Sequence, residues 1–261
     1  MKLLAIGNSF SQDATTFLHQ TAAAQGIDLT AVNLYIGGCS LETHWKNWEQ
    51  DAADYELQIN GQAQGRQVGI REMLAQGGWD FIVTQQASHD SGWMDTYEPF
   101  LGQLIGEWKK AAPKARLLLH ETWAYEHGSN HGAFARYHRD QEEMYRRLRR
   151  CYTEMARRYG LALIPCGDVI QAVRSLHPFN VPGGGRSLCR DGFHMSLGYG
   201  RYLLACVWLK ALCGVSVAQN PYTPESEEAV DPALLQIIRR QADGNAKISS
   251  FRQENEARKT Y

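Results

Sequence analysis

The fold of this chain is indicated near its start by the sequence Leu3-Leu4-Ala5-Ile6-Gly7-Asn8-Ser9. Four consecutive apolar residues followed by a glycine are typical of a short buried strand that ends in a tight turn. Similar apolar runs recur at residues 29–35, 81–84, 116–120 and 161–164, with helical patterns between them. This alternation predicts an α/β fold: a three-layer α/β/α sandwich of flavodoxin-like type with a mainly parallel five-stranded sheet.

Helical periodicity is clearest at residues 141–159, where Met144, Leu148, Cys151 and Met155 mark one apolar face opposite an arginine-rich one. Further helices are expected at residues 13–25 and 70–75, with Asp13 as the N-cap of the first. Residues 55–67 surround the dipeptide Asn60-Gly61, which predicts a small β-hairpin over the surface.

The strand and helix units account for residues 1–215, which we expect to form one domain. Residues 216–261 are expected to be a C-terminal extension that packs on this domain or is partly disordered. Within it, residues 233–241 have a helical pattern, and the stretch 245–261 is polar and charged.

Composition limits the function classes. The 261 residues carry a formal net charge of −1, with 44% hydrophobic and 21% charged residues. This balance excludes a broadly basic nucleic-acid-binding protein and a polybasic membrane-surface protein. The start lacks the apolar run of a signal peptide, and the six cysteines show no disulfide or zinc pattern, so we expect a cytoplasmic protein. The oligomeric state stays open.

Residues suited to acyl transfer lie at or near the ends of predicted elements. Ser9 follows the first strand, and the sequence Asp191-Gly192-Phe193-His194 precedes the last strong helix. A serine hydroxyl is a poor nucleophile that needs an adjacent base. His194 is the candidate base, and Asp191 is expected to orient its ring and stabilise the imidazolium. As an alternative, Ser9 is simply the N-cap of a helix.

An oxyanion formed at such a serine needs hydrogen-bond donors. Gly38 follows the second strand, and Gln85 and Gln86 follow the third. We expect the backbone N–H groups of Ser9 and Gly38 to donate, together with a side-chain amide from Gln85, or from Gln86 as a close second.

These residues resemble the SGNH, or GDSL-like, hydrolases, in which a serine follows the first strand, a glycine the second and an asparagine the third. The stretch Gly7-Asn8-Ser9 matches the first block, and residues 191–194 match the C-terminal D-x-x-H block. The third block departs from the family's G-x-N-D, because this chain has Gln85-Gln86-Ala87-Ser88. The resemblance covers residues 3–213 and is to a bacterial branch of the superfamily; carbohydrate esterases with a Q-G-E block there have a similar layout.

The resemblance implies a serine esterase without a cofactor that forms an acyl-Ser9 intermediate and removes a small acyl group, most simply acetyl, from a carbohydrate. A thioesterase or lysophospholipase is the nearest alternative. A non-catalytic carbohydrate-binding protein is another, and the lack of a phosphate-binding motif disfavours a nucleotide-binding flavodoxin-like protein.

Aromatic and histidine side chains near the predicted strand ends are candidates for binding the substrate. We expect Trp123, Tyr125 and His44 to line its pocket, although aromatic residues in such positions often belong to the core. His127 and His131 have helical i,i+4 spacing, but the glycines around them favour a loop and no H-E-x-x-H motif is present, so no metal is expected.

Overall fold

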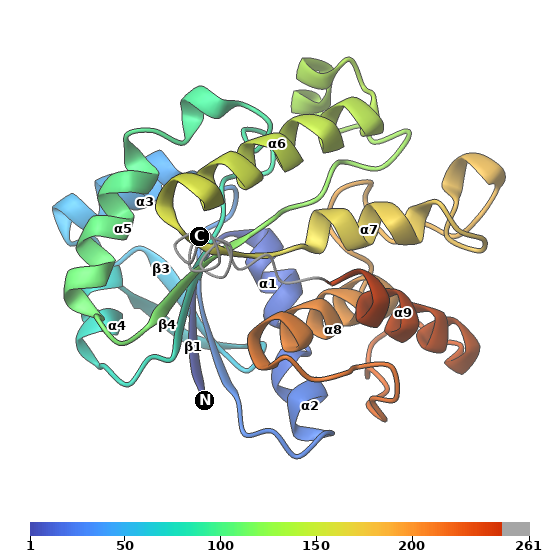
Figure 1. The fold of residues 1–261 in the computed structure, drawn as a ribbon, viewed down its shortest axis with the longest axis horizontal. Helices are drawn as coiled ribbons and strands as arrows, with labels where there is room; N and C mark the ends of the chain where they lie inside the picture. The colour runs from blue at the N-terminus through green and yellow to red at the C-terminus, as the bar shows by residue number, and fades with distance from the viewer. Residues whose placement is uncertain (247–261) are drawn as a thin grey trace, which may run out of the picture.

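One mixed sheet organises the part of the chain that the computed structural model describes, residues 1–246 (Figure 1). Within these residues, seven strands lie in the order β4-β3-β2-β1-β5-β6-β7. The strands are β1 (Lys2–Gly7), β2 (Thr30–Tyr35), β3 (Tyr55–Ile59), β4 (Gln62–Val68), β5 (Phe81–Thr84), β6 (Arg116–His120) and β7 (Ala162–Ile164).

The five strands expected from the apolar runs are all present and parallel, in the spatial order β2-β1-β5-β6-β7. This is the order of a flavodoxin-like doubly wound sheet. The expected strand count is wrong, because β3 and β4 extend the sheet instead of lying over the surface. β3 pairs antiparallel with β2, and the turn between β3 and β4 contains Asn60 and Gly61, both at positive φ.

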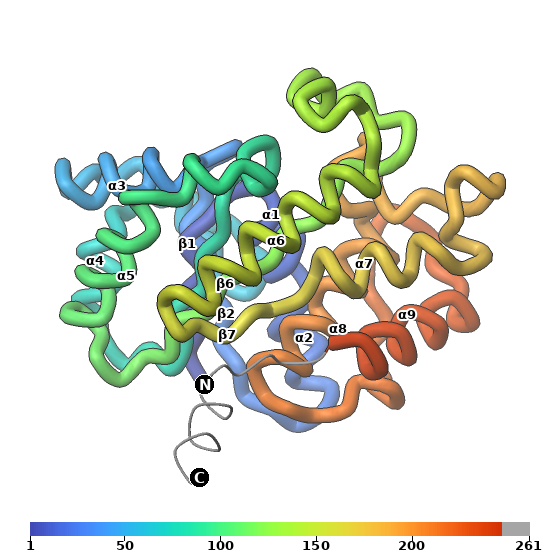
Figure 2. The backbone as a smooth tube through the Cα atoms, turned by 45° about the horizontal axis from the view of Figure 1, so that its top comes forward, coloured from blue at the N-terminus to red at the C-terminus, as the bar shows by residue number. Residues whose placement is uncertain are grey.

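Helices cover both faces of the sheet (Figure 1). α1, α2 and α8 lie on one side, and α3, α4, α5 and α6 lie on the other, while α7 and α9 lie beside α8 (Figure 2). The helices are α1 (Ser9–Thr15), α2 (Leu18–Ala23), α3 (Leu41–Gln50), α4 (Ile70–Ala75), α5 (Phe100–Ala111), α6 (Gln141–Tyr159), α7 (Cys166–Arg174), α8 (Tyr199–Cys213) and α9 (Pro232–Asn245). Short 3₁₀ turns lie at η1 (Met94–Thr96), η2 (Gly132–Tyr137) and η3 (Val181–Gly183).

Two expectations about the first helix are wrong. The single helix expected at residues 13–25 is two short helices, α1 and α2, and the first begins at Ser9. Its N-cap is Asn8, whose Oδ1 accepts a hydrogen bond from the backbone N–H of Phe10 at 3.0 Å. Asp13 therefore lies inside α1 and caps nothing.

α8 is apolar on nearly every side, so it needs cover on its outer face as well as against the sheet. α9 supplies that cover through Leu235, Ile238 and Ala242, which are buried. Asp243 of α9 also accepts hydrogen bonds from Lys210 Nζ at 2.8 Å and from the backbone N–H of Val217 at 2.9 Å. α9 thus packs against α8, and residues 247–261 of the predicted 245–261 stretch lie outside the described residues.

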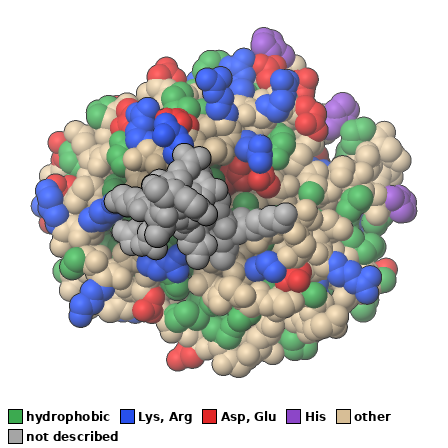
Figure 3. Space-filling model, viewed as in Figure 1, with side chains coloured by type: hydrophobic (Ala, Val, Ile, Leu, Met, Phe, Trp, Pro, Cys, Tyr) green, Lys and Arg blue, Asp and Glu red, His purple; other side chains and the backbone are tan. Residues whose placement is uncertain are grey.

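The surface carries acidic and basic side chains close together on the face drawn in Figure 3, in keeping with the net charge of −1. No helix within residues 1–246 has the length and apolar character needed to cross a membrane.

Candidate active site

Ser9 stands where the central strand of the sheet ends. β1 pairs with β2 on one side and β5 on the other, and Leu3, Leu4, Ala5 and Ile6 are completely buried. The chain turns at Asn8, and Ser9 is the first residue of α1. In open α/β sheets, ligands bind outside the carboxyl ends of the strands, so the fold places this hydroxyl at the expected edge.

His194 and Asp191 come together with Ser9 across 185 and 182 residues of sequence. The Ser9 hydroxyl lies 2.9 Å from His194 Nε2, and His194 Nδ1 lies 2.7 Å from Asp191 Oδ2. An ionised carboxylate only accepts hydrogen bonds, so the proton of the neutral imidazole is on Nδ1 and Nε2 is free to accept the serine proton. The three side chains form a continuous hydrogen-bonded chain from hydroxyl to carboxylate.

Asp191 is held in its ionised form by its own loop. Partial burial raises the pKa of Asp191, but this is outweighed by hydrogen bonds from the His194 ring and from the backbone N–H groups of His194 and Phe193, so the pKa is lowered overall. Those backbone donors lie 2.8 Å and 3.2 Å from Asp191 Oδ1. The three-residue spacing of the motif thus closes a turn that fixes the carboxylate and the imidazole together.

A tight turn brings Gly38 next to the residues before Ser9. The Cys39 N–H donates to Ile36 O at 3.2 Å, and Gly38 has a φ of +65°, which favours glycine. Asn8 Nδ2 donates to Cys39 O at 3.0 Å and holds the turn against the end of β1. Within residues 1–246, the backbone N–H groups of Ser9 and Gly38 have no hydrogen-bond acceptor, so both are available to an oxyanion.

The structure offers neither glutamine amide to an oxyanion. Gln86 uses its Oε1 for the backbone N–H of Leu41 at 3.0 Å and its Nε2 for Thr96 O at 2.8 Å. Gln85 is completely buried, and its Nε2 donates to Asn8 Oδ1 at 3.2 Å. A Cβ on Gly7 would lie 2.3 Å from Gln85 Nε2, so the glycine makes room for this amide. Gln85 therefore holds the Asn8 side chain in place through a buried hydrogen bond.

The three expected substrate-binding residues lie in the interior. Trp123 and Tyr125 are 0% exposed. The Trp123 ring stacks on that of Phe10, with 3.9 Å between the ring centroids, and its Nε1 donates a hydrogen bond to Phe193 O at 2.7 Å. His44 is also 0% exposed, 2.8 Å from the Tyr55 hydroxyl, and burial lowers its pKa to about 3. With no exposed surface, none of the three contacts a ligand directly; Trp123 supports the loop of His194 instead.

The family model of a domain of unknown function, DUF4886, matches residues 2–242. The chain belongs to the DUF4886 family. A DUF4886 family protein from Bacteroides uniformis ATCC 8492 is 34% identical to it, with a TM-score of 0.87 over 97% of this chain and 98% of that one. A search of curated proteins returns no match.

More distant solved structures share the fold of the DUF4886 chain. A putative SGNH hydrolase from Slackia heliotrinireducens is 21% identical, with a TM-score of 0.54 over 80% of this chain and 97% of that one. A variant of Axe2, an acetyl-xylooligosaccharide esterase from Geobacillus stearothermophilus, is 16% identical, with a TM-score of 0.55 over 81% and 94%. The DUF4886 chain therefore has an α/β fold similar to that of SGNH hydrolases, as the sequence motifs indicate.

Phe193, to which sequence reasoning gave no role, and His131, which it considered for a metal site and set aside, lie next to His194. The Phe193 ring lies 4.0 Å from that of His194 and 4.7 Å from that of His131, measured between centroids. Burial, together with the imidazoles of His89 and His194, lowers the pKa of His131. Phe193 lies inside the D-x-x-H motif, so its place was available from the sequence. The position of His131 depends on how the loop after β6 folds.

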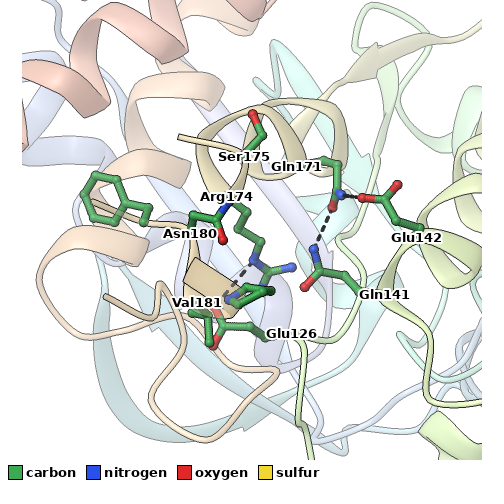
Figure 4. A pocket seen from close by; sticks show the side chains of 10 residues that line it. Glu126, Gln141, Glu142, Gln171, Arg174, Ser175, Asn180 and Val181 are labelled. Carbon is green, nitrogen blue, oxygen red and sulfur yellow. Dashed lines mark hydrogen bonds and ion pairs between the residues drawn. The ribbon is translucent and has the colours of Figure 1, made fainter. Parts of the chain in front are cut away.

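A polar cavity of about 250 Å³ (Figure 4) lies beside the loop that carries Asp191 and His194 in the DUF4886 chain. Glu126 and Arg174 line it, 3.6 Å apart and almost fully buried. Glu126 accepts a hydrogen bond from Leu188 N at 3.3 Å and donates from its backbone to Gly192 O at 2.8 Å. These contacts hold the loop in place, and the residues that line the cavity do not include Ser9, Asp191 or His194.

No group of three or more His, Cys, Asp or Glu side chains in the described part of the chain is placed to hold a metal ion.

Proposed function

We propose that the protein is a serine esterase in which Ser9, His194 and Asp191 form the catalytic triad. The observation that carries the proposal is the hydrogen-bonded chain Ser9 Oγ–His194 Nε2 at 2.9 Å and His194 Nδ1–Asp191 Oδ2 at 2.7 Å. Its members come from two distant parts of the sequence and meet at the carboxyl end of the central strand. Helix capping alone requires no such chain, since Asn8 already caps α1.

The chemistry follows from the geometry. His194 Nε2 takes the hydroxyl proton as Ser9 Oγ attacks the ester carbonyl carbon, and Asp191 stabilises the resulting imidazolium. The backbone N–H groups of Ser9 and Gly38 are available to the oxyanion of the tetrahedral intermediate. His194 then gives the proton to the oxygen of the departing alcohol, leaving an acyl-Ser9 ester. Water attacks this ester with His194 again as base, which releases the acid and restores Ser9.

For the substrate, we propose a small acyl ester, acetyl, carried by a carbohydrate. The support is the fold shared with Axe2, an acetyl-xylooligosaccharide esterase whose catalytic variants replace a serine and an aspartate. Phe193 fits this proposal, because it is partly exposed beside His194 and aromatic faces suit sugar rings.

The test combines turnover with covalent labelling. The protein is given 4-nitrophenyl acetate, acetylated xylooligosaccharides and long-chain acyl esters and thioesters, and is separately treated with a fluorophosphonate and analysed by mass spectrometry. We expect acetyl ester turnover and a single label on Ser9. Ser9→Ala is expected to lose the label and at least about 10³-fold of kcat, whereas Ser175→Ala, a serine on the C-cap of α7, keeps both.

Three other outcomes would each change the proposed mechanism or substrate. Turnover that persists with Ser9 unlabelled refutes the mechanism. A preference for long-chain acyl esters or thioesters retains the triad but replaces the substrate class. Equal sugar binding by the wild type and Ser9→Ala, with no turnover by either, identifies a binding protein that keeps the fold.

A further inference from the structure

Asp13 is a fully buried carboxylate surrounded by donors from the far end of the chain. Its two oxygens accept hydrogen bonds from Arg190 Nη1 at 3.0 and 3.1 Å, and Oδ1 also accepts from Arg201 Nε at 2.8 Å. The backbone N–H of Met195 donates to Oδ2 at 2.9 Å. Two guanidinium groups and one peptide N–H therefore converge on one side chain that is 0% exposed.

The positions of these partners link the two halves of the triad. Asp13 lies four residues after Ser9, one turn further along α1. Arg190 directly precedes Asp191, and Met195 directly follows His194. One carboxylate thus ties the helix that begins with the nucleophile to both ends of the tetrapeptide that carries the acid and the base.

Besides Asp13, the tetrapeptide is attached toward α1 through Trp123, which donates to Phe193 O and stacks on Phe10. Residues 190–191 are exposed and residues 192–194 are only partly buried. The Arg190 backbone N–H donates to His194 O at 2.9 Å, which closes the loop on itself but does not attach it to α1. The Ser9–His194 hydrogen bond forms only if the loop keeps a fixed position relative to α1. A displacement of about 1 Å lowers the rate of such a reaction roughly 10²-fold.

We infer that Asp13 is a positioning residue for the triad, which with Arg190 and Arg201 sets the distance between Ser9 Oγ and His194 Nε2. The inference rests on the proposed function. Removing the charge of Asp13 while keeping its shape leaves two partly exposed guanidinium groups, whose side chains are 30% and 19% exposed, without their carboxylate partner, so they separate and release the loop.

The test compares Asp13→Asn with Asp243→Asn. Asp243 undergoes the same chemical change in a carboxylate that also accepts from a cation and a backbone N–H, but between α8 and α9. Circular dichroism first establishes a temperature at which both variants are folded. For Asp13→Asn we expect kcat on an acetyl ester to fall by about 10- to 100-fold with KM within twofold, and Ser9 phosphonylation to slow by the same factor. For Asp243→Asn we expect a lower Tm, with kcat and phosphonylation within twofold of wild type.

Arg190→Met supplies the second variant, because its side chain is partly exposed and the change leaves Asp13 with Arg201. Arg190→Met is expected to lower kcat and the phosphonylation rate about tenfold. If Asp13→Asn does not fold, the Arg190→Met result tests the positioning role of Asp13 in its place. A folded Asp13→Asn, or in its absence a folded Arg190→Met, with wild-type kcat and labelling overturns the inference alone. A wild-type protein whose Ser9 is never labelled overturns the proposed function and this inference with it.

Discussion

Replacement of Glu121 by glutamine tests how a buried acid affects stability. Glu121 follows β6 and is 1% exposed, packed against the backbone of Gly167. Burial raises the pKa of Glu121 to about 8, and the charge of Asp168 adds to this effect, while a hydrogen bond from the Asp168 N–H and the charge of Arg149 act in the opposite direction. Glu121→Gln keeps the shape and an acceptor oxygen but removes the titration.

The sign follows from where the proton is bound. In the unfolded chain the carboxyl group loses its proton above its usual value of about 4.5, whereas in the folded protein it keeps the proton up to about 8. Between these values the folded state binds more protons, so the free energy of unfolding falls as pH rises, by about 1.4 kcal/mol per pH unit. The full effect is about 5 kcal/mol, reached above pH 8 and absent below pH 4.5.

Urea denaturation of both proteins at pH 5.5, 6.5, 7.5 and 8.5 measures this effect. The stability of Glu121→Gln relative to wild type is expected to rise steadily with pH over this range. Glu107→Gln is the matched control, since Glu107 forms an exposed pair with Lys110 at 2.7 Å, and its difference from wild type should stay within about 1 kcal/mol. If the Glu121→Gln difference is the same at every pH, Glu121 is ionised in the folded protein and the reasoning is wrong.

The glutamine pair and the buried tryptophan give the remaining predictions. Gln86→Ala deprives buried backbone N–H groups of their acceptor and is expected to lower the free energy of unfolding by about 2–4 kcal/mol in urea denaturation. Gln85→Ala is expected to lower kcat roughly tenfold with KM within twofold, because Asn8 loses its support next to the nucleophile; a loss of 10²–10³ would show instead that Gln85 donates directly to the oxyanion. Trp123→Phe leaves Phe193 O without its donor and is expected to cost about 1–3 kcal/mol of stability. A raised KM at unchanged stability would show instead that Trp123 contacts the substrate.

Local sequence patterns were sufficient for most of the sheet. The buried parallel strands are short runs of consecutive apolar residues, because both of their faces are covered by helices. The β-hairpin at residues 55–67 was recognised from Asn60-Gly61, but its place in the sheet was not. β4 is largely polar and exposed, as an edge strand often is, so nothing in its sequence distinguishes a sheet edge from a surface excursion.

The candidate site also had some parts that local sequence could predict and others that it could not. Ser9 after a strand and the Asp191–His194 spacing are local signals, because a turn of three residues is enough to join an aspartate and a histidine. Whether Trp123 and Tyr125 face a ligand or the core depends on what packs over them. Here they are enclosed by neighbours such as Phe10 and Phe193.

By itself the sequence determined the five buried strands of an α/β fold, the candidate serine and the candidate aspartate–histidine pair, since each depends on residues close together in the chain or on short-range periodicity. Only the tertiary structure decided that Gln85 and Gln86 are occupied inside the protein and that Asp13 joins α1 to the acid–base loop. Those assignments depend on burial and on partners up to 188 residues away. Local patterns carry no information about such contacts, because they form only when the whole chain is folded.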